Sequence, residues 1–153
     1  MIFALLIVHG LLAVALLGAL THQAFAVASA KSDKRSFLGR FRTVNAAAYA
    51  KPIVLLFVVT ALGGALLYPD YRVNVRPALE DLQLRAANGI FEIKEHLAAV
   101  GLGVLPGYWF YWQTPLAPEQ GRTRRHLTWL LAFLVWWSFL TGHVLNNIRG
   151  LGQ

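Results

Sequence analysis

Four long apolar stretches constrain the fold of this chain more than any other feature of its sequence. They cover roughly residues 2–28, 52–68, 91–112 and 127–148, and crossing the hydrocarbon core of a bilayer takes about 20 apolar residues in a helix. Only 14% of the residues are charged, which is low for a soluble domain. The sequence therefore predicts an all-α fold, an integral membrane four-helix bundle in which residues 1–153 form a single membrane domain.

The first apolar stretch is expected to remain in the mature protein. Residues 26–30 read AVASA and resemble a signal-peptidase site. However, residues 1–8 lack the basic segment that opens a signal peptide, and the apolar run is longer than the core of such a peptide. We therefore interpret residues 2–28 as a retained span.

The basic residues predict the orientation of the spans. Segments 29–51 and 113–126 hold nine of the 14 Lys and Arg residues and two of the seven acidic ones, so they carry the whole net charge of +7. Basic loops stay on the cytoplasmic side, which places both termini on the periplasmic side of a bacterial inner membrane. Because topology explains the excess positive charge, we expect a lipid bilayer as partner and no nucleic acid.

The connection between the second and third spans is too polar to insert into a bilayer. It covers residues 68–89, and Val75, Leu79, Leu82 and Ala86 recur within it at helical spacing. This pattern predicts a short amphipathic helix lying on the outer surface. Such a helix would offer a docking surface to other membrane subunits or to a periplasmic electron-transfer protein.

Three histidines fall at one depth. At about 1.5 Å per residue, His9, His96 and His143 all lie roughly 8–11 Å below the outer boundary. An ionisable residue inside a membrane helix indicates a functional site, and three of them in one layer predict a shared ligand. His22 and His126 lie near the cytoplasmic boundary and are interpreted as interfacial residues.

The residues around this layer favour a planar macrocycle over a bare metal ion. The small residues Gly89, Ala99 and Gly103 share the face of His96. The aromatic residues Trp136 and Phe139 flank His143. The chain has no cysteine, which excludes covalent c-type haem and iron–sulfur clusters, and its one methionine is Met1. Two histidines holding a b-type haem are then the natural ligation.

Polar residues near the outer boundary could complete such a site. Arg72, Arg76 and Arg149 are candidates for pairing with haem propionates. Glu92 precedes His96 by one helical turn, where it could accept the imidazole N–H or take a proton from a bound quinol, so quinone is a second candidate ligand. Lys94 lies about 200° around the helix from His96, and we expect it to extend to the lipid headgroups.

Four spans with helix-borne histidines at one depth resemble the small four-helix membrane cytochrome b subunits of bacteria. The resemblance implies a mono-haem electron carrier, because the spans do not supply two aligned histidine pairs. No nucleotide-binding glycine loop, His-Glu-x-x-His motif or Ser-His-Asp set is present. We therefore expect an electron-transfer or accessory subunit rather than a free-standing enzyme.

Three functions remain open from the sequence. The first is a small inner-membrane subunit of a larger respiratory or photosynthetic complex that binds one b-type haem near the periplasmic side. The second is a structural or assembly subunit without a cofactor, in which the histidines make interhelical hydrogen bonds. The third is a metal site in which His9, His96 and His143 hold copper or zinc.

Overall fold

The described parts of the chain consist of helices and the turns between them. The computed structural model describes residues 2–28, 36–42, 44–113 and 120–151, and no strand occurs within those ranges. In chain order the elements are α1 (Ile2–Ala28), α2 (Phe37–Arg42), the 3₁₀ helix η1 (Ala46–Tyr49), α3 (Ala50–Asp70), the π-helical turn η2 (Tyr71–Val75), α4 (Arg76–Asp81), α5 (Arg85–Gln113) and α6 (Gln120–Leu151). The all-α prediction is confirmed.

Each predicted span corresponds to one long helix, but the helices differ in how apolar they are. Three helical segments are long and apolar enough to cross a membrane: Ile2–Ala28, Ala46–Asp81 and Gln120–Asn147. Helix α5 has 29 residues, yet it is not among these three. Its first turns carry charged residues and its last turns are rich in Tyr and Trp, both of which lower its hydropathy.

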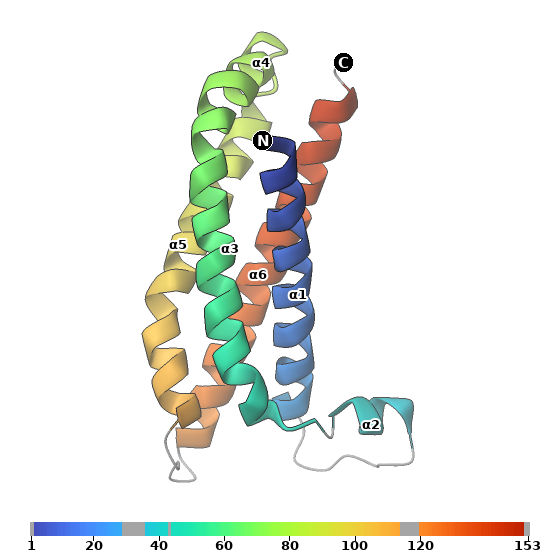
Figure 1. Ribbon diagram of the computed structural model, residues 1–153, viewed down its shortest axis with the longest axis vertical. Helices are drawn as coiled ribbons and strands as arrows, with labels where there is room; N and C mark the ends of the chain where they lie inside the picture. The colour runs from blue at the N-terminus through green and yellow to red at the C-terminus, as the bar shows by residue number, and fades with distance from the viewer. Residues whose placement is uncertain (1, 29–35, 43, 114–119, 152–153) are drawn as a thin grey trace.

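The four long helices lie side by side and leave both chain termini at one end (Figure 1). Helix α1 packs against α3 and α6, and α5 packs against the same two helices. We call the end that holds the start of α1, α4 and the end of α6 the hairpin end. The opposite end, where α2 and the first turns of α3 and α6 lie, is called the basic end.

The prediction of a separate amphipathic helix lying on the surface was wrong. Helix α3 continues through η2 and α4 as one helical segment to Asp81, and the chain then reverses at 82–84 so that α5 begins at Arg85. Val75 and Leu79 face the start of α5 and pack there with Phe91. Val75 and Leu79 thus mark the contact face of a helical hairpin, whereas Leu82 and Ala86, the other two residues of the predicted apolar face, lie beyond α4 and are exposed.

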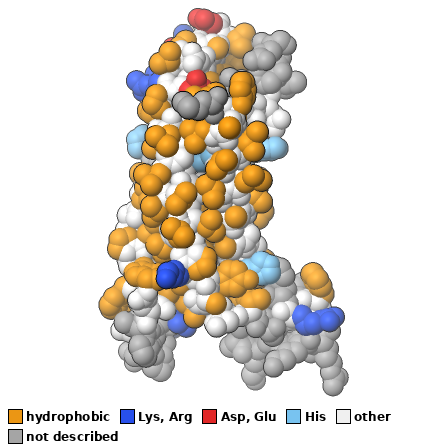
Figure 2. Space-filling view, viewed as in Figure 1, with side chains coloured by type: hydrophobic (Ala, Val, Ile, Leu, Met, Phe, Trp, Pro, Cys, Tyr) orange, Lys and Arg blue, Asp and Glu red, His pale blue; other side chains and the backbone are white. Residues whose placement is uncertain are grey.

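The outer surface between the two ends is predominantly apolar. Figure 2 shows hydrophobic side chains over the middle of the molecule, with Lys, Arg, Asp and Glu gathered towards its ends. Large apolar residues are strongly exposed there; Phe3 is 72% exposed and Leu11 is 66% exposed. Such a surface fits association with a lipid bilayer, because soluble proteins rarely expose apolar patches of this extent.

The main core lies in the half towards the basic end and draws on all four long helices. Its buried residues are Leu16, Leu20, Ala24, Ala50, Ile53, Phe57, Leu105, Tyr108, Trp112, Leu131, Ala132, Leu134 and Val135. Gly101 of α5 sits directly over the ring of Phe57, and a Cβ at this glycine would overlap that ring. The missing side chain therefore allows α5 to approach α3 closely.

A hydrogen-bond network ties the helices together at the same end. The hydroxyl of Tyr108 on α5 donates to Oε1 of Gln23 on α1 at 2.6 Å, and Nε2 of Gln23 donates to the carbonyl of Ala46 at 2.9 Å. The indole N–H of Trp112 donates to Oγ1 of Thr128 on α6 at 3.2 Å. These buried polar groups have partners, so the network fixes the helices without an unpaired group.

Candidate functional site

A large cavity opens between α1, α3, α5 and α6 in the half towards the hairpin end. Its volume is about 890 Å³, which lies in the range of small-molecule sites. Most of the lining side chains are apolar or aromatic. His9, His96 and His143 all line it, so the structure brings the three histidines of the predicted layer to the wall of one cavity.

His9 is the most enclosed of the three. Its ring packs against α3, where a Cβ added to Gly63 would lie 3.2 Å from Nδ1 and one added to Gly64 would lie 3.4 Å from Cε1. The two glycines therefore admit an imidazole between α1 and α3. Within the described ranges, Nδ1 of His9 is buried without a hydrogen-bond partner, and the same is true of Oγ1 of Thr60, which also lines the cavity.

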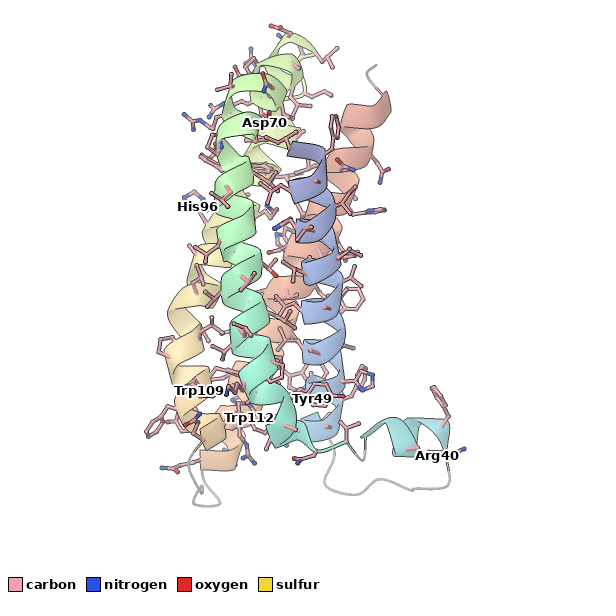
Figure 3. The ribbon with its side chains drawn as sticks, in the orientation of Figure 1. Arg40, Tyr49, Asp70, His96, Trp109 and Trp112 are labelled. Carbon is pink, nitrogen blue, oxygen red and sulfur yellow. The ribbon has the colours of Figure 1, made fainter. Side chains whose placement is uncertain are left out.

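His96 lies on the outer side of α5 and is exposed (Figure 3). Its Nδ1 is 2.7 Å from the carbonyl oxygen of Glu92, one turn earlier in the same helix. When Nδ1 carries the proton, it donates to this carbonyl and Nε2 becomes the nitrogen that can bind an external ligand. The partner is the backbone of Glu92, whereas the sequence suggested its carboxylate.

His143 on α6 is also exposed, and its ring is stacked on Phe139 with 6.4 Å between ring centroids. The side chain of Asn147 donates to the carbonyl of His143 at 2.9 Å. Asn147 thus satisfies a backbone group near the end of α6. It makes no described contact with the imidazole ring itself.

The three histidines do not form a closed metal site. Among the residues that the structure describes, no group of three or more His, Cys, Asp or Glu side chains is arranged to hold a metal ion. A copper or zinc site built from His9, His96 and His143 would therefore require their side chains to move. A b-type haem held by two histidines would require only two of the three imidazoles to come together.

Two of the three arginines predicted to pair with a propionate group already lie beside carboxylates of this chain. Glu92 accepts a hydrogen bond from Arg76 at 3.2 Å, and Arg72 lies 4.0 Å from the same carboxylate oxygen. Arg76 also pairs with Glu80 at 2.9 Å. Arg149 belongs to α6, but its side chain lies outside the described residues. These contacts form an exposed charged cluster on the hairpin, next to the cavity.

Lys94 was expected to extend to the headgroups, but it turns into the space between α5 and α6. Its side chain is only 17% exposed and pairs with Glu95. The ammonium group lies 4.5 Å from the ring centroid of Phe91, and a Cβ at Gly142 of α6 would lie 4.0 Å from Lys94 Cε. Both Lys94 and Glu95 line the cavity, so sequence reasoning missed a charged pair at this site.

Stacked aromatic rings form the wall of the cavity near the hairpin. The rings of Tyr71 and Phe91 are nearly parallel with centroids 3.5 Å apart, and Tyr68 stacks on Phe91 at 6.3 Å. The buried hydroxyl of Tyr71 donates to Oδ1 of Asn88 at 3.0 Å. These contacts hold the hairpin against α5 and fix one side of the opening.

The two remaining histidines lie away from this cavity. His22 is stacked on Tyr49 with 6.0 Å between centroids, towards the basic end. His126 is exposed in the first turns of α6. Figure 3 shows Tyr49, Trp109 and Trp112 at the same end, where an aromatic belt is expected at a membrane boundary.

Comparison with known proteins identifies no family for this chain. No protein-family model matches the chain, and no curated protein or solved structure matches it.

Proposed function

We propose that the protein is a small membrane subunit of an electron-transfer complex and binds one b-type haem in the cavity near the hairpin end. The observation that carries the proposal is that His9, His96 and His143, from three different helices, line one cavity. Two imidazoles would hold a b-type haem in a bis-histidine site, and imidazole is the donor that this chain offers.

The chemistry of the cavity fits this group. Its volume of about 890 Å³ and its mainly apolar wall suit a large planar ligand. Among the described residues, two buried polar atoms beside the cavity, Nδ1 of His9 and Oγ1 of Thr60, have no hydrogen-bond partner. When bound, a b-type haem supplies one-electron transfer.

Each residue of the site then has a distinct task. His9 would be one ligand of the haem iron, because it is the most enclosed imidazole and its ring packs against Gly63 and Gly64. His96 or His143 would be the other, and each is exposed and would turn towards the cavity to bind. The Glu92 carbonyl orients the ring of His96 and leaves its Nε2 as the ligating nitrogen. A quinone is the alternative ligand for the same apolar wall.

The same proposal extends to topology and partners. The basic end faces the cytoplasm of a bacterial inner membrane and both termini face the periplasm, as the distribution of positive charge favours. The cavity then lies on the periplasmic side. The charged cluster of Arg72, Arg76 and Glu92 offers a surface to other membrane subunits or to a periplasmic electron-transfer protein.

A second candidate is a structural subunit without a cofactor. The packing of His9 against Gly63 and Gly64 and the stacking of His143 on Phe139 favour it, because both imidazoles already have a place in helix packing. A copper or zinc site formed by His9, His96 and His143 is the third candidate, and their side chains would have to move to form it, because the described residues hold no such group as they stand.

Histidine substitutions separate the first two candidates. Each of His9→Ala, His96→Ala and His143→Ala is purified in mild detergent, and the reduced-minus-oxidised absorption spectrum is recorded, with His126→Ala as the control. We expect His9→Ala and one of the other two to abolish or shift the haem band while the control leaves it unchanged. A haem spectrum unaltered in all three variants would refute the assignment.

A further inference from the structure

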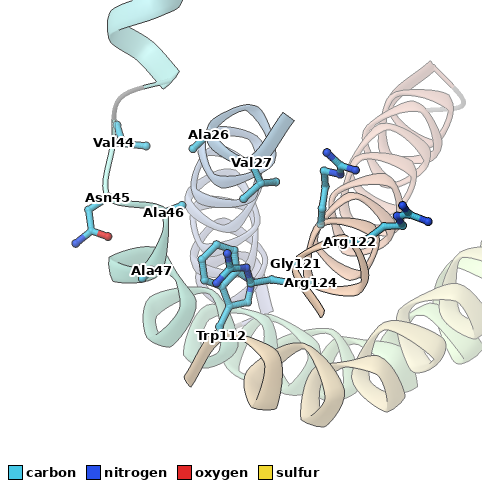
Figure 4. A pocket seen from close by; sticks show the side chains of 11 residues that line it. Ala26, Val27, Val44, Asn45, Ala46, Ala47, Trp112, Gly121, Arg122 and Arg124 are labelled. Atoms are coloured by element: carbon cyan, nitrogen blue, oxygen red, sulfur yellow. The ribbon is translucent and has the colours of Figure 1, made fainter. Parts of the chain in front are cut away.

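A second cavity, of about 660 Å³, lies at the basic end (Figure 4). It is enclosed by the last turn of α1, by η1 and the residues before it, by Trp112 of α5 and by the first turns of α6. Arg122, Arg124 and Arg125 contribute three guanidinium groups to its wall. It is separate from the cavity that holds the histidines.

The positive charge of this cavity has no carboxylate beside it among the described residues. None of the described lining residues is Asp or Glu, and the ion pairs that the described ranges contain all lie in the hairpin or the first turns of α5. An anion in the cavity would accept bidentate hydrogen bonds from the guanidinium groups that line it.

One of the three arginines is held in a fixed position. The guanidinium group of Arg124 lies over the ring of Trp112, 4.7 Å from its centroid. Trp112 is anchored by its indole N–H to Thr128, and the hydroxyl of Thr128 donates to the carbonyl of Arg124 at 2.9 Å. Arg122 and Arg125 are exposed at the rim. The wall therefore has one fixed cation, Arg124, with two exposed cations beside it.

The position of the cavity indicates the source of the anion. Trp109 and Trp112 lie at its level (Figure 3), and such aromatic residues mark the headgroup region of a bilayer. Ala26 and Val27 give the same cavity an apolar side, continuous with helices whose outer faces are apolar. We propose that this cavity binds the phosphate of an anionic phospholipid headgroup, with Arg124 as the fixed contact. The proposal does not depend on haem.

Native mass spectrometry of the full chain in detergent tests this site. The probes are phosphatidylglycerol, phosphatidylcholine and inorganic phosphate, and the variant is Arg122→Gln/Arg125→Gln. Arg40→Gln/Lys51→Gln is the matched control, because it removes the same charge from exposed residues at the same end that do not line the cavity. Arg124→Lys keeps the charge but loses the planar stacking on Trp112.

We expect the wild-type chain to retain phosphatidylglycerol in preference to phosphatidylcholine. The Arg122→Gln/Arg125→Gln variant should bind phosphatidylglycerol at least about tenfold more weakly, and Arg124→Lys should also bind it more weakly. The control should lose less than about threefold, because screened charges farther from the headgroup contribute little. Unchanged thermal unfolding of the variants would show that the weaker lipid binding does not come from a loss of folded structure.

Three results would overturn the proposal. Equal losses in the cavity variant and the control would assign binding to general surface charge. Equal retention of phosphatidylcholine and phosphatidylglycerol would remove the requirement for an anion. Binding of inorganic phosphate as tight as that of phosphatidylglycerol would show that a lipid is not the ligand.

Discussion

The two halves of this molecule are built from the same four long helices, but they are packed in different ways. Towards the basic end the helices close on a continuous core, and Gln23, Tyr108 and Thr128 are buried with hydrogen-bond partners. Towards the hairpin end they separate around the cavity of about 890 Å³. There, buried atoms of His9 and Thr60 lack partners.

This difference assigns a separate role to each half. A core with satisfied polar groups stabilises the arrangement of the helices, whereas unpaired polar atoms in a cavity wall cost free energy unless something binds them. Binding sites lie where the packing of a fold is incomplete. We therefore propose that the packed core of the basic half stabilises the fold and that the larger cavity of the hairpin half is the candidate haem site, separate from the headgroup cavity proposed at the basic end.

The largest effect on stability is expected from Gly101→Ala. Its new Cβ would overlap the buried ring of Phe57, and overpacking of this kind costs about 1–3 kcal/mol. Gly103→Ala is the matched control in the same helix, because nothing lies within 4 Å of its Cβ position. Thermal unfolding in detergent measures both. Equal stability of the two variants would contradict the close packing of α3 on α5.

A smaller loss is expected from Gln23→Leu. This change leaves the Tyr108 hydroxyl and the Ala46 carbonyl without their partner, and loss of two hydrogen bonds between membrane helices costs about 1–2 kcal/mol. The double variant Gln23→Leu/Tyr108→Phe should be less destabilised than the sum of the single variants, since both partners are then apolar. Additive losses would mean that the two side chains do not interact.

The smallest effect on stability is expected when one threonine in each half is replaced by valine. Thr128→Val removes a hydroxyl that accepts a hydrogen bond from the indole N–H of Trp112 and donates one to the backbone carbonyl of Arg124. This change should destabilise the protein by about 0.6–1 kcal/mol. Thr60→Val removes a buried hydroxyl without a partner and should leave the ligand-free protein unchanged or slightly more stable. The same unfolding assay compares them, and a larger loss from Thr60→Val would reverse the roles of the two halves.

The sequence predicted the helices well because their hydrophobic runs are long. All four predicted spans became helices, and α1 has the predicted bounds of 2–28. The hairpin was not predicted, because its turn holds none of the residues that usually signal one. Gln83 adopts a φ of 59° at this turn, in the left-handed region where Gly or Asn is usual. Helical spacing in Val75 and Leu79 identified an apolar face but not the helix that covers it.

At the candidate site, the sequence predicted which histidines lie near one cavity, but it did not predict which side chains face inward. Counting residues placed His9, His96 and His143 on the wall of one cavity. The angular argument correctly put Lys94 opposite His96, but it assigned the inward face to the wrong residue, since Lys94 is mostly buried and His96 is exposed. Periodicity gives relative angles along one helix. Which face turns inward depends on packing against α6, as the contact of Lys94 with Gly142 illustrates.

The most direct test of the central claim is a reduced-minus-oxidised absorption spectrum of the wild-type protein isolated in mild detergent, with a pyridine haemochrome assay for stoichiometry. We expect a sharp b-type α-band upon reduction and about one haem per chain. Protein isolated intact with its natural partners and containing no haem would contradict it. The cavity would then belong to a structural subunit.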